Sequence, residues 1–503
     1  MSLRRLTFET AESGSKPRTL TVTIPAHHSI VLGAGIGGLS MAILLAKAGR
    51  RVTLLEKTPA IGGRLVRFRR QGIPFDTGLH FTSSLVGILG QMLTTLDSID
   101  GIEADSFPWS LKLPDGHHLH FPNQGRDAFY DYLAQEFPRE TAQLRHYQEL
   151  ETEVLRNTPM FDLRAPVGDA MTAFSELDQL PLETLFRQLD LSPELAAALA
   201  SPALYHGAPP EEVPAARHFR VSYGFEEEMI RLKGGGDRLV ANFARELARL
   251  GVEVRTNTVI VEFQEFDSAG HARTALLSDG TTLPFDDLFC SLHPAELLPL
   301  LPPERQRGLK RLVAPLQDTC GFFTVFATVD DELPCQPQLD SCLRTLNFNH
   351  ILRPDRNEPF LSTGAIFSHD THTDGTPIQC LILLAPAPAP SQATKPTPDE
   401  KTAMTQTVLE HAYETWPELR GHLYLAAAAT PHTYARYIPP GHGAYGVRMT
   451  TDAPRLMGRL PIRNFYGIGE NAFAPGIVGT LLSSFLVTRQ VLGEEEYLKL
   501  LPN

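Results

Sequence analysis

The segment His28–Lys57, HSIVLGAGIGGLSMAILLAKAGRRVTLLEK, constrains the fold of this chain more than any other stretch. Its pattern predicts an apolar strand, a glycine-rich turn, a helix and a second apolar strand that ends in an acidic residue. Two strands joined through a helix lie parallel in one sheet, with a right-handed crossover. The segment therefore predicts a βαβ unit within an α/β fold.

Three glycines of this segment have the G-x-G-x-x-G spacing of a dinucleotide-binding turn. Gly33 allows the tight turn, Gly35 lets a pyrophosphate approach the backbone, and Gly38 lets the helix pack close to the strand. Glu56 ends the second strand, where a carboxylate can accept hydrogen bonds from ribose hydroxyls. The alternative is a Rossmann-like turn that binds no nucleotide. The residues expected to contact the nucleotide here are Gly33, Gly35, Ile36, Gly37, Gly38, Glu56 and Lys57.

A second turn distinguishes a flavin from a nicotinamide cofactor. The stretch AIGGRLVRF (Ala60–Phe68) places Gly62, Gly63 and Arg64 just beyond the acidic residue, as long flavin-binding proteins do. Only this G-x-G-x-x-G match lies between a predicted strand and a predicted helix, so the sequence indicates no second, nicotinamide-binding domain. These observations predict FAD as the cofactor.

A third glycine-rich stretch, GIGENAFAPGIVGT (Gly467–Thr480), lies near the other end of the sequence. Its glycines permit close backbone approach, and Glu470 is placed to bind ribityl hydroxyls. The turn Gly476–Gly479 opens a helix whose N-terminus would face the electron-rich edge of a flavin. A structural strand–turn–helix would explain this stretch alone, but not together with the first motif.

The character of the sequence alternates along the chain. Residues 95–230 show helical periodicity, residues 231–263 return to α/β character, and apolar strands between 296 and 430 predict a second sheet. The Pro- and Ala-rich stretch Ala385–Glu400 is expected to be a loop. We predict a Rossmann-like, amine-oxidase-like FAD-binding domain of the glutathione-reductase type, interleaved with a mixed-sheet and helical substrate-binding domain. The FAD-binding domain would comprise residues 28–95, 231–295 and 431–503, the substrate domain 96–230 and 296–430, and an N-terminal extension residues 1–27.

Composition excludes several other classes of function. The net charge of −13 argues against binding to nucleic acid. The five cysteines form no CxxC pair and the histidines no HExxH motif, so we expect neither a disulfide framework nor a metal site. The sequence has no uninterrupted apolar run of about 18 residues. We expect a cytoplasmic protein with at most peripheral contact to a membrane.

The chain resembles the phytoene desaturase-type FAD oxidoreductases, and within them the carotenoid isomerase and retinol saturase branch. The branch has counterparts of FDTGLHF (Phe75–Phe81), of ATPHTYARYIPPGHGAYG (Ala429–Gly446) and of the ending Pro461–Gly479. CSLHPAELLPLL (Cys290–Leu301) resembles the family's strand-to-helix segment near the flavin. The resemblance is faint in residues 95–230, and Glu470–Asn471 replaces a more usual Gln–Asp pair.

This resemblance implies further contacts with FAD. The turn at Gly78 and the residues after it would lie beside the isoalloxazine ring, and the backbone of Ile260 would line the adenine pocket. The remaining contacts belong to the two later glycine-rich motifs. The implied residues are Gly62, Gly63, Arg64, Gly78, Leu79, His80, Ile260, Gly469, Glu470, Gly476, Ile477 and Val478.

The resemblance also implies a reaction. A flavin can exchange a hydride with carbon, and an apolar cavity suits a polyene. We expect desaturation, saturation or cis–trans isomerisation of a long carotenoid- or retinoid-like substrate, with the electron acceptor left open. One alternative is a flavin amine oxidase, although the chain has only two tryptophans and no paired-aromatic motif. A second is a non-catalytic prenyl-binding or lipid-binding protein on the same fold.

His80 is the leading candidate for a catalytic residue, with Tyr434, Tyr437 and His442 behind it. Each has a structural alternative, since buried tyrosines and core histidines are common. Asp76 precedes Thr77 and Gly78, so its carboxylate is expected to accept backbone N–H groups in an Asx turn.

Overall fold

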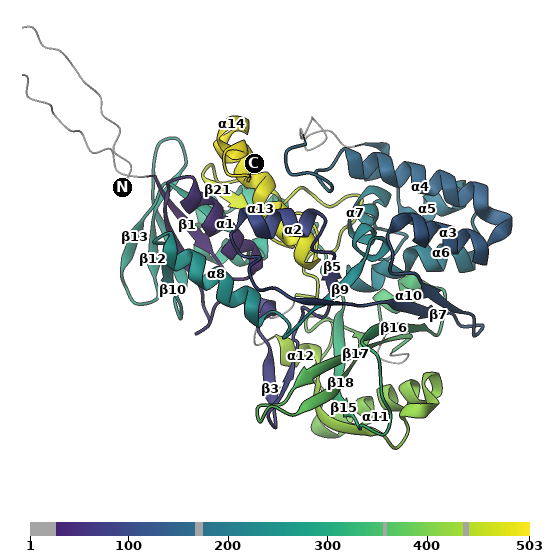
Figure 1. Ribbon diagram of the computed structural model, residues 1–503. Coiled ribbons are helices and arrows are strands. Elements are labelled where there is room, and N and C mark those ends of the chain that lie inside the picture. The colour runs from purple at the N-terminus through teal and green to yellow at the C-terminus, as the bar shows by residue number, and fades with distance from the viewer. Residues whose placement is uncertain (1–26, 166–174, 356–359, 436–441, 503) are drawn as a thin grey trace, which may run out of the picture.

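The computed structural model of the chain describes residues 27–165, 175–355, 360–435 and 442–502. Within these residues two large sheets dominate, each with helices packed against it (Figure 1).

The predicted βαβ unit is confirmed. β1 (His28–Leu32) and β2 (Arg51–Leu55) pair in parallel and are joined by α1 (Ile36–Lys47). Strands from later in the sequence extend the sheet in the order β10-β2-β1-β14-β21-β20. The added strands are β10 (Glu253–Arg255), β14 (Asp287–Cys290), β20 (Gly458–Arg459) and β21 (Phe465–Gly467).

Alternate residues of β1 face two different layers. Val31 points into a layer of helices, whereas Ile30 and Leu32 pack against a small antiparallel sheet. In the helical layer α1 (purple) and α13 (yellow) lie side by side (Figure 1). The helices are α2 (Ile88–Thr95), α8 (Asp237–Arg249), α13 (Gly476–Leu492) and α14 (Glu494–Leu498), and the small sheet contains β11 (Ile260–Phe266), β12 (Ala272–Leu277) and β13 (Thr282–Pro284).

The predicted second sheet is also present. Its order is β19-β15-β18-β17-β16-β7-β8, and all neighbours are antiparallel except β16 and β7. One face packs on α11 (Pro398–Thr415), and the other faces helices of the segment 126–226. The strands are β7 (Trp109–Lys112), β8 (His118–Phe121), β15 (Gly321–Val329), β16 (Gln338–Leu343), β17 (Ser362–Thr371), β18 (Pro377–Ala387) and β19 (Leu423–Ala429).

Two expectations about this region are corrected. The segment 96–230 is not uniformly helical, because β7 and β8 pair through Leu111 and Leu119 and add two strands to the second sheet. The stretch Ala385–Glu400 is not all loop. Its first three residues belong to β18, which stays paired with β15 as far as Ala387, and its last three begin α11 behind a capping box at Thr397.

The remaining elements connect these layers. β5 (Thr82–Ser83), β9 (Met229–Leu232) and β6 (Ala104–Ser106) form a short sheet, and β3 (Phe68–Arg70) and β4 (Ile73–Phe75) form a hairpin. None of the helices described is long and apolar enough to span a membrane. The other helices are α3 (Arg126–Glu136), α4 (Thr141–Arg156), α5 (Leu182–Gln188), α6 (Pro193–Ala200), α7 (Ala215–Glu226), α9 (Arg307–Val313), α10 (Phe348–Leu352) and α12 (Pro431–Tyr434).

Candidate cofactor and active site

The glycine-rich turn after β1 has the geometry of a phosphate cradle. Gly33 has φ +95°, and a Cβ there would overlap the Ser291 hydroxyl. A Cβ on Gly38 would overlap the Gly33 carbonyl oxygen, so the helix and the turn need glycine at both positions. A Cβ on Gly35, by contrast, would meet no atom within 4 Å. This open side lies at the N-terminus of α1, where free N–H groups favour an anion.

Glu56 is held rigidly at the end of β2. One carboxylate oxygen accepts from the Ala34 N–H at 2.8 Å, and the other accepts from the Thr58 N–H and hydroxyl at 2.8 and 2.7 Å. Thr258 N–H donates to the Glu56 carbonyl at 2.9 Å, which brings the start of β11 beside it. The side chain of Ile260 is buried in the core, so only its backbone can contribute to a pocket there. Lys57, the next residue after Glu56, is exposed.

The GGR turn and the C-terminal motif meet although they lie at opposite ends of the sequence. Arg64 and Glu470 form an ion pair across 406 residues of sequence. A Cβ on Gly37 would lie 3.1 Å from the Gly469 Cα, so α1 and this motif are in close backbone contact. Gly476 has φ +82° and open space beside it, and it begins α13, whose first turn leaves Ile477 and Val478 partly exposed.

The turn of the GGR motif also packs against the segment that carries His80. A Cβ on Gly63 would lie 3.0 Å from the Gly35 Cα, and one on Gly78 would lie 3.0 Å from the Arg64 Cβ. Gly62 donates its N–H to the Ala34 carbonyl at 2.8 Å. The three motifs and the Gly78–His80 segment therefore surround one region.

Asp76 has a different role from the one expected. One of its oxygens pairs with Arg231, 155 residues away, and the other has no hydrogen-bond partner. The predicted Asx turn is therefore wrong, because a buried guanidinium takes the place of the backbone donors. Arg231 also donates to the His80 carbonyl at 3.0 Å and so fixes the backbone at the candidate catalytic residue.

This pair belongs to a ladder of charges that is buried except at its exposed last member, Asp237. Arg231 lies 3.4 Å from Asp370 of β17, and Asp370 accepts two hydrogen bonds of 2.9 Å from Arg67. Arg67 in turn bonds Asp237 at the start of α8, at 3.1 and 2.8 Å. The ladder Asp76–Arg231–Asp370–Arg67–Asp237 therefore joins the segments around the candidate flavin site to the second sheet.

His80 is neutral in this setting. Desolvation by burial lowers the pKa of its imidazole to about 4; Asp76 opposes the shift and Arg231 adds to it. Its Nδ1 is buried without a hydrogen-bond partner, and the adjacent Leu79 is buried. An uncharged imidazole with a free nitrogen can accept or donate one hydrogen bond to a bound molecule.

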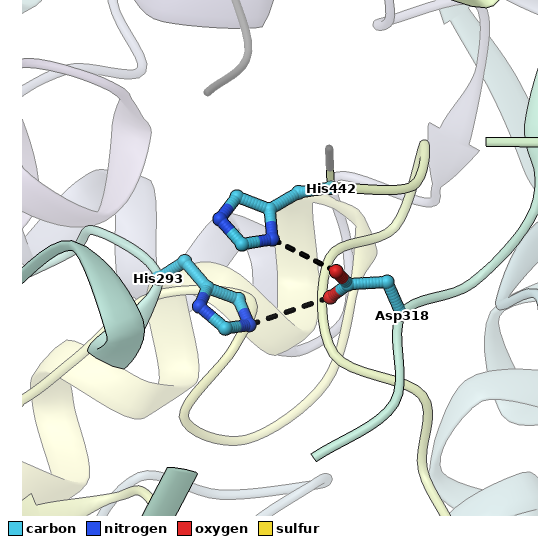
Figure 2. A group of neighbouring side chains, drawn as sticks. All are labelled: His293, Asp318 and His442. Carbon is cyan, nitrogen blue, oxygen red and sulfur yellow. Dashed lines mark hydrogen bonds and ion pairs between the residues drawn. The ribbon is translucent and has the colours of Figure 1, made fainter. Parts of the chain in front are cut away.

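His442 is engaged elsewhere. Figure 2 shows its Nδ1 directed at Asp318, at 2.9 Å, and its Nε2 lies 3.3 Å from Glu296. Burial lowers the pKa of His442, but the two carboxylates outweigh that effect and hold it above its usual value. The ring stacks on His293, with centroids 3.8 Å apart. His442 therefore bridges the carboxylates of Asp318 and Glu296.

His293, Asp318 and His442 could suggest a metal site, since their possible ligand atoms lie close together. His293 argues against it. Its Nδ1 accepts a hydrogen bond from the Ala295 N–H at 3.1 Å, so the proton of a neutral ring is on Nε2, which faces Asp318 at 3.3 Å. A protonated nitrogen offers no lone pair to a metal, and in this cluster only His442 is hydrogen-bonded to Asp318, while His293 lies in contact with the other carboxylate oxygen.

Two tyrosines that the sequence did not single out lie near the candidate flavin site. The environment of Tyr445 includes the charges of Arg64 and Glu470, and its hydroxyl has only a 3.5 Å contact, to the Leu204 carbonyl. The ring of Tyr205 meets Phe81 edge-on at 5.4 Å. Tyr445 lies in the stretch Ala429–Gly446 and Tyr205 in the segment 95–230, but no sequence spacing distinguished either from a structural tyrosine.

These tyrosines share a poorly hydrated environment with Tyr434. Burial raises the pKa of Tyr434 to about 12 and those of Tyr205 and Tyr445 further, although all three residues are only partly buried. Tyr434 donates to the Thr324 hydroxyl at 2.9 Å. Tyr437 lies outside the described residues.

Comparison with known families identifies the class of protein to which this chain belongs. The model of the flavin containing amine oxidoreductases matches residues 36–491, from α1 to α13. The chain belongs to this family. The resemblance inferred from the motifs is confirmed: the chain is a flavin-dependent oxidoreductase with the mixed α/β fold of that family.

Individual relatives of this flavoprotein fit the same branch. All-trans-retinol 13,14-reductase of Macaca fascicularis is 25% identical over 535 residues, covering 93% of this chain and 86% of the relative. Phytoene desaturase of Fusarium fujikuroi is 29% identical over 282 residues, covering 51% of this chain and 47% of the relative. An oxidoreductase from Methanosarcina mazei shares the fold, with TM-score 0.64 and 16% identity over 92% of this chain and all of its own.

Proposed function

We propose that this flavoprotein binds FAD and acts on carbon–carbon double bonds of a long apolar polyene, retinoid- or carotenoid-like. The observation that carries the proposal is the convergence of the two terminal motifs, linked by the Arg64–Glu470 pair, beside the segment that carries His80. The relatives named for retinol and phytoene act on polyenes by their names, and they support this choice of substrate.

The residues fit FAD in their chemistry. The open side of Gly35 at the start of α1 suits a pyrophosphate, and Glu56 has lone pairs left for ribose hydroxyls. Glu470 and Arg64 would bind the ribityl chain, and the start of α13 at Gly476 would face the pyrimidine edge. Residues 28–95, 231–295 and 431–503 would form the FAD-binding domain, and 96–230 and 296–430 the substrate-binding domain.

Bound FAD would supply a ring nitrogen that exchanges a hydride with carbon. The chain itself would orient the substrate, and aromatic side chains such as Phe81 and Tyr205 would help to exclude water. Neutral His80 would hydrogen-bond the cofactor or the substrate through its free nitrogen. Arg231 holds the His80 carbonyl and so positions the imidazole.

We propose saturation as the first direction to test. The retinol reductase relative matches 93% of this chain, whereas the phytoene desaturase relative matches about half. The experiment is an anaerobic assay of chemically reduced holoprotein with all-trans-retinol, followed by mass spectrometry for a product two mass units heavier. Oxidised holoprotein with phytoene, examined for products two mass units lighter, tests desaturation.

The proposal is overturned if purified protein carries no flavin and cannot be reconstituted with FAD, or if the flavin-loaded protein changes neither substrate. Hydrogen peroxide released with a panel of amines would instead favour the amine oxidase alternative. That alternative has the weaker support, because the two relatives compared above are named for polyene substrates.

We also propose that one surface contacts lipid, since a polyene substrate partitions into membranes. Val86 is 92% exposed just before α2, and Phe161 is 41% exposed. Gln91 of α2 bonds the Phe161 carbonyl at 2.8 Å, so both apolar side chains belong to one neighbourhood. Val86→Glu and Phe161→Glu together should reduce co-sedimentation with phosphatidylcholine vesicles several-fold. Unchanged co-sedimentation would contradict this contact.

A further inference from the structure

One arginine close to the candidate site has no partner for its charge. Arg217 is the third residue of α7, and its side chain makes no hydrogen bond or ion pair among the residues that the structure describes. The residue is only partly exposed, and burial lowers the pKa of its guanidinium to about 10. A poorly hydrated cation without a counterion costs stability unless a bound anion compensates it.

The neighbouring charges do not compensate Arg217. Arg220, one turn further along α7, donates a hydrogen bond of 2.9 Å to the carboxylate of Asp178. The same carboxylate accepts hydrogen bonds from the Ser175 N–H and hydroxyl, at 3.2 and 2.9 Å. The positive charges of Arg220 and Arg455 add to the lowering of the pKa of Arg217, and Asp178 opposes them. The charges around Arg217 are therefore mainly positive, and the carboxylate among them already has other donors.

The side of α7 that carries Arg217 leads towards the candidate flavin site. Most of the helix is buried, and its partly exposed positions are Arg217, Arg220, Val221 and Gly224. Residues four and seven positions apart lie on one face, so Arg217, Val221 and Gly224 form a row about 10 Å long. A Cβ on Gly224 would lie 3.7 Å from the Ser83 Cβ, so this end of the row contacts β5, which starts two residues after His80.

The chemistry of this row suits an apolar molecule with an acid group at one end. A guanidinium binds both oxygens of a carboxylate through two parallel N–H donors. An apolar chain attached to that carboxylate can lie along Val221 and Gly224, which offer no polar side-chain group. Carbons about 10 Å from the acid group would then lie beside the segment that carries His80.

We propose that Arg217 binds a carboxylate of the substrate, so that the preferred polyene is a long-chain acid rather than an alcohol or a hydrocarbon. This proposal rests on the proposed function and narrows its substrate class. The carboxylate supplies the missing counterion, and the apolar chain extends along the row Arg217–Val221–Gly224 towards β5. Because the acid group is held at one end of the row, it determines which double bond reaches the flavin-binding segments.

The test compares two compounds that differ in charge at one end, with FAD-loaded protein. They are all-trans-retinoic acid and its methyl ester. Wild-type protein should bind the acid more tightly than the ester, as measured by titration of the flavin absorbance spectrum and by KM. Arg217→Gln should weaken binding of the acid about ten- to a hundredfold and leave the ester unchanged, since it removes one charged hydrogen-bonding partner.

Three controls separate binding from folding. Arg217→Lys keeps the charge but not the paired donors, so it should weaken acid binding less than Arg217→Gln does. Arg187→Gln removes an exposed arginine from the neighbouring helix α5 and should change neither compound. The melting temperature of the apoprotein should stay the same or rise in Arg217→Gln, because an unpaired, poorly hydrated charge is removed.

Several results would overturn the proposal. Equal losses for acid and ester in Arg217→Gln, with a lower melting temperature, would show a structural role instead. An anion could also come from a lipid headgroup, so loss of co-sedimentation with phosphatidylglycerol vesicles, with unchanged acid binding, would contradict the substrate assignment. Wild-type turnover of the ester and of retinol without preference for the acid would overturn this proposal alone, whereas no turnover of any of the three would overturn the proposed function.

Discussion

At the scale of single residues, His80 links the stability of the fold to pH. Its pKa is lowered to about 4 in the folded protein, against about 6.5 in an unfolded chain. The unfolded state therefore gains a proton first as pH falls, and His80 destabilises the fold progressively between pH 6.5 and 4, by at most about 3 kcal/mol. His80→Phe should reduce this loss of stability and lower turnover while FAD stays bound. Urea unfolding at pH 7, 5.5 and 4.5 measures the difference, and identical pH slopes in both proteins would contradict it.

Also at this scale, substitutions of Gly35 and Gly38, seven and ten positions after His28, should cause opposite defects. Gly35→Ala places a methyl group in open space beside the α1 N-terminus, so it should weaken FAD binding about tenfold or more without changing the melting temperature of the apoprotein. Gly38→Ala would force α1 away from the Gly33 carbonyl and should lower that melting temperature. The measurements are FAD titration and thermal unfolding. A Gly35→Ala protein with normal FAD affinity would contradict the cradle.

At the scale of elements, the charge ladder fastens β9 to β17 and to the residues on either side of the β3–β4 hairpin, Arg67 and Asp76. Arg231→Met leaves Asp76 and Asp370 buried without this partner, which should cost about 3–5 kcal/mol of unfolding free energy. Adding Asp76→Asn removes one stranded charge and should recover part of the loss. Urea unfolding of the single and double variants measures this, and a double variant as unstable as the sum of both single variants would argue against coupling.

At the scale of the whole molecule, FAD would stabilise the fold by joining segments from both ends of the sequence. At a hundred times its Kd, FAD should add about 2.7 kcal/mol to the unfolding free energy. Glu470→Gln weakens the Arg64 contact and should reduce this gain. Thermal unfolding with and without FAD measures the effect, and an FAD-independent melting temperature would contradict it.

The sequence predicted those parts of this molecule that depend on local rules. The βαβ unit, α8 and the C-terminal strand–turn–helix follow from apolar periodicity and from glycines at positions whose backbone geometry other residues rarely adopt. The partners of Asp76, Tyr205 and Glu470 lie more than 100 residues away along the chain, and no spacing rule connects them. Asp76 is an example: its sequence neighbours predicted hydrogen bonds from nearby backbone N–H groups, whereas in the fold its carboxylate pairs with the distant Arg231.

The shared sheet has a consequence for how the protein is made. Ribosomes release β1 and α1 early, but α13, which packs beside α1, emerges only after more than 400 further residues. Until then the nascent βαβ unit lacks one neighbour in its helical layer, and its apolar surface there stays uncovered. The cofactor cradle is complete only when Glu470 has been synthesised. Flavin binding to the complete cradle would therefore follow the synthesis of Glu470.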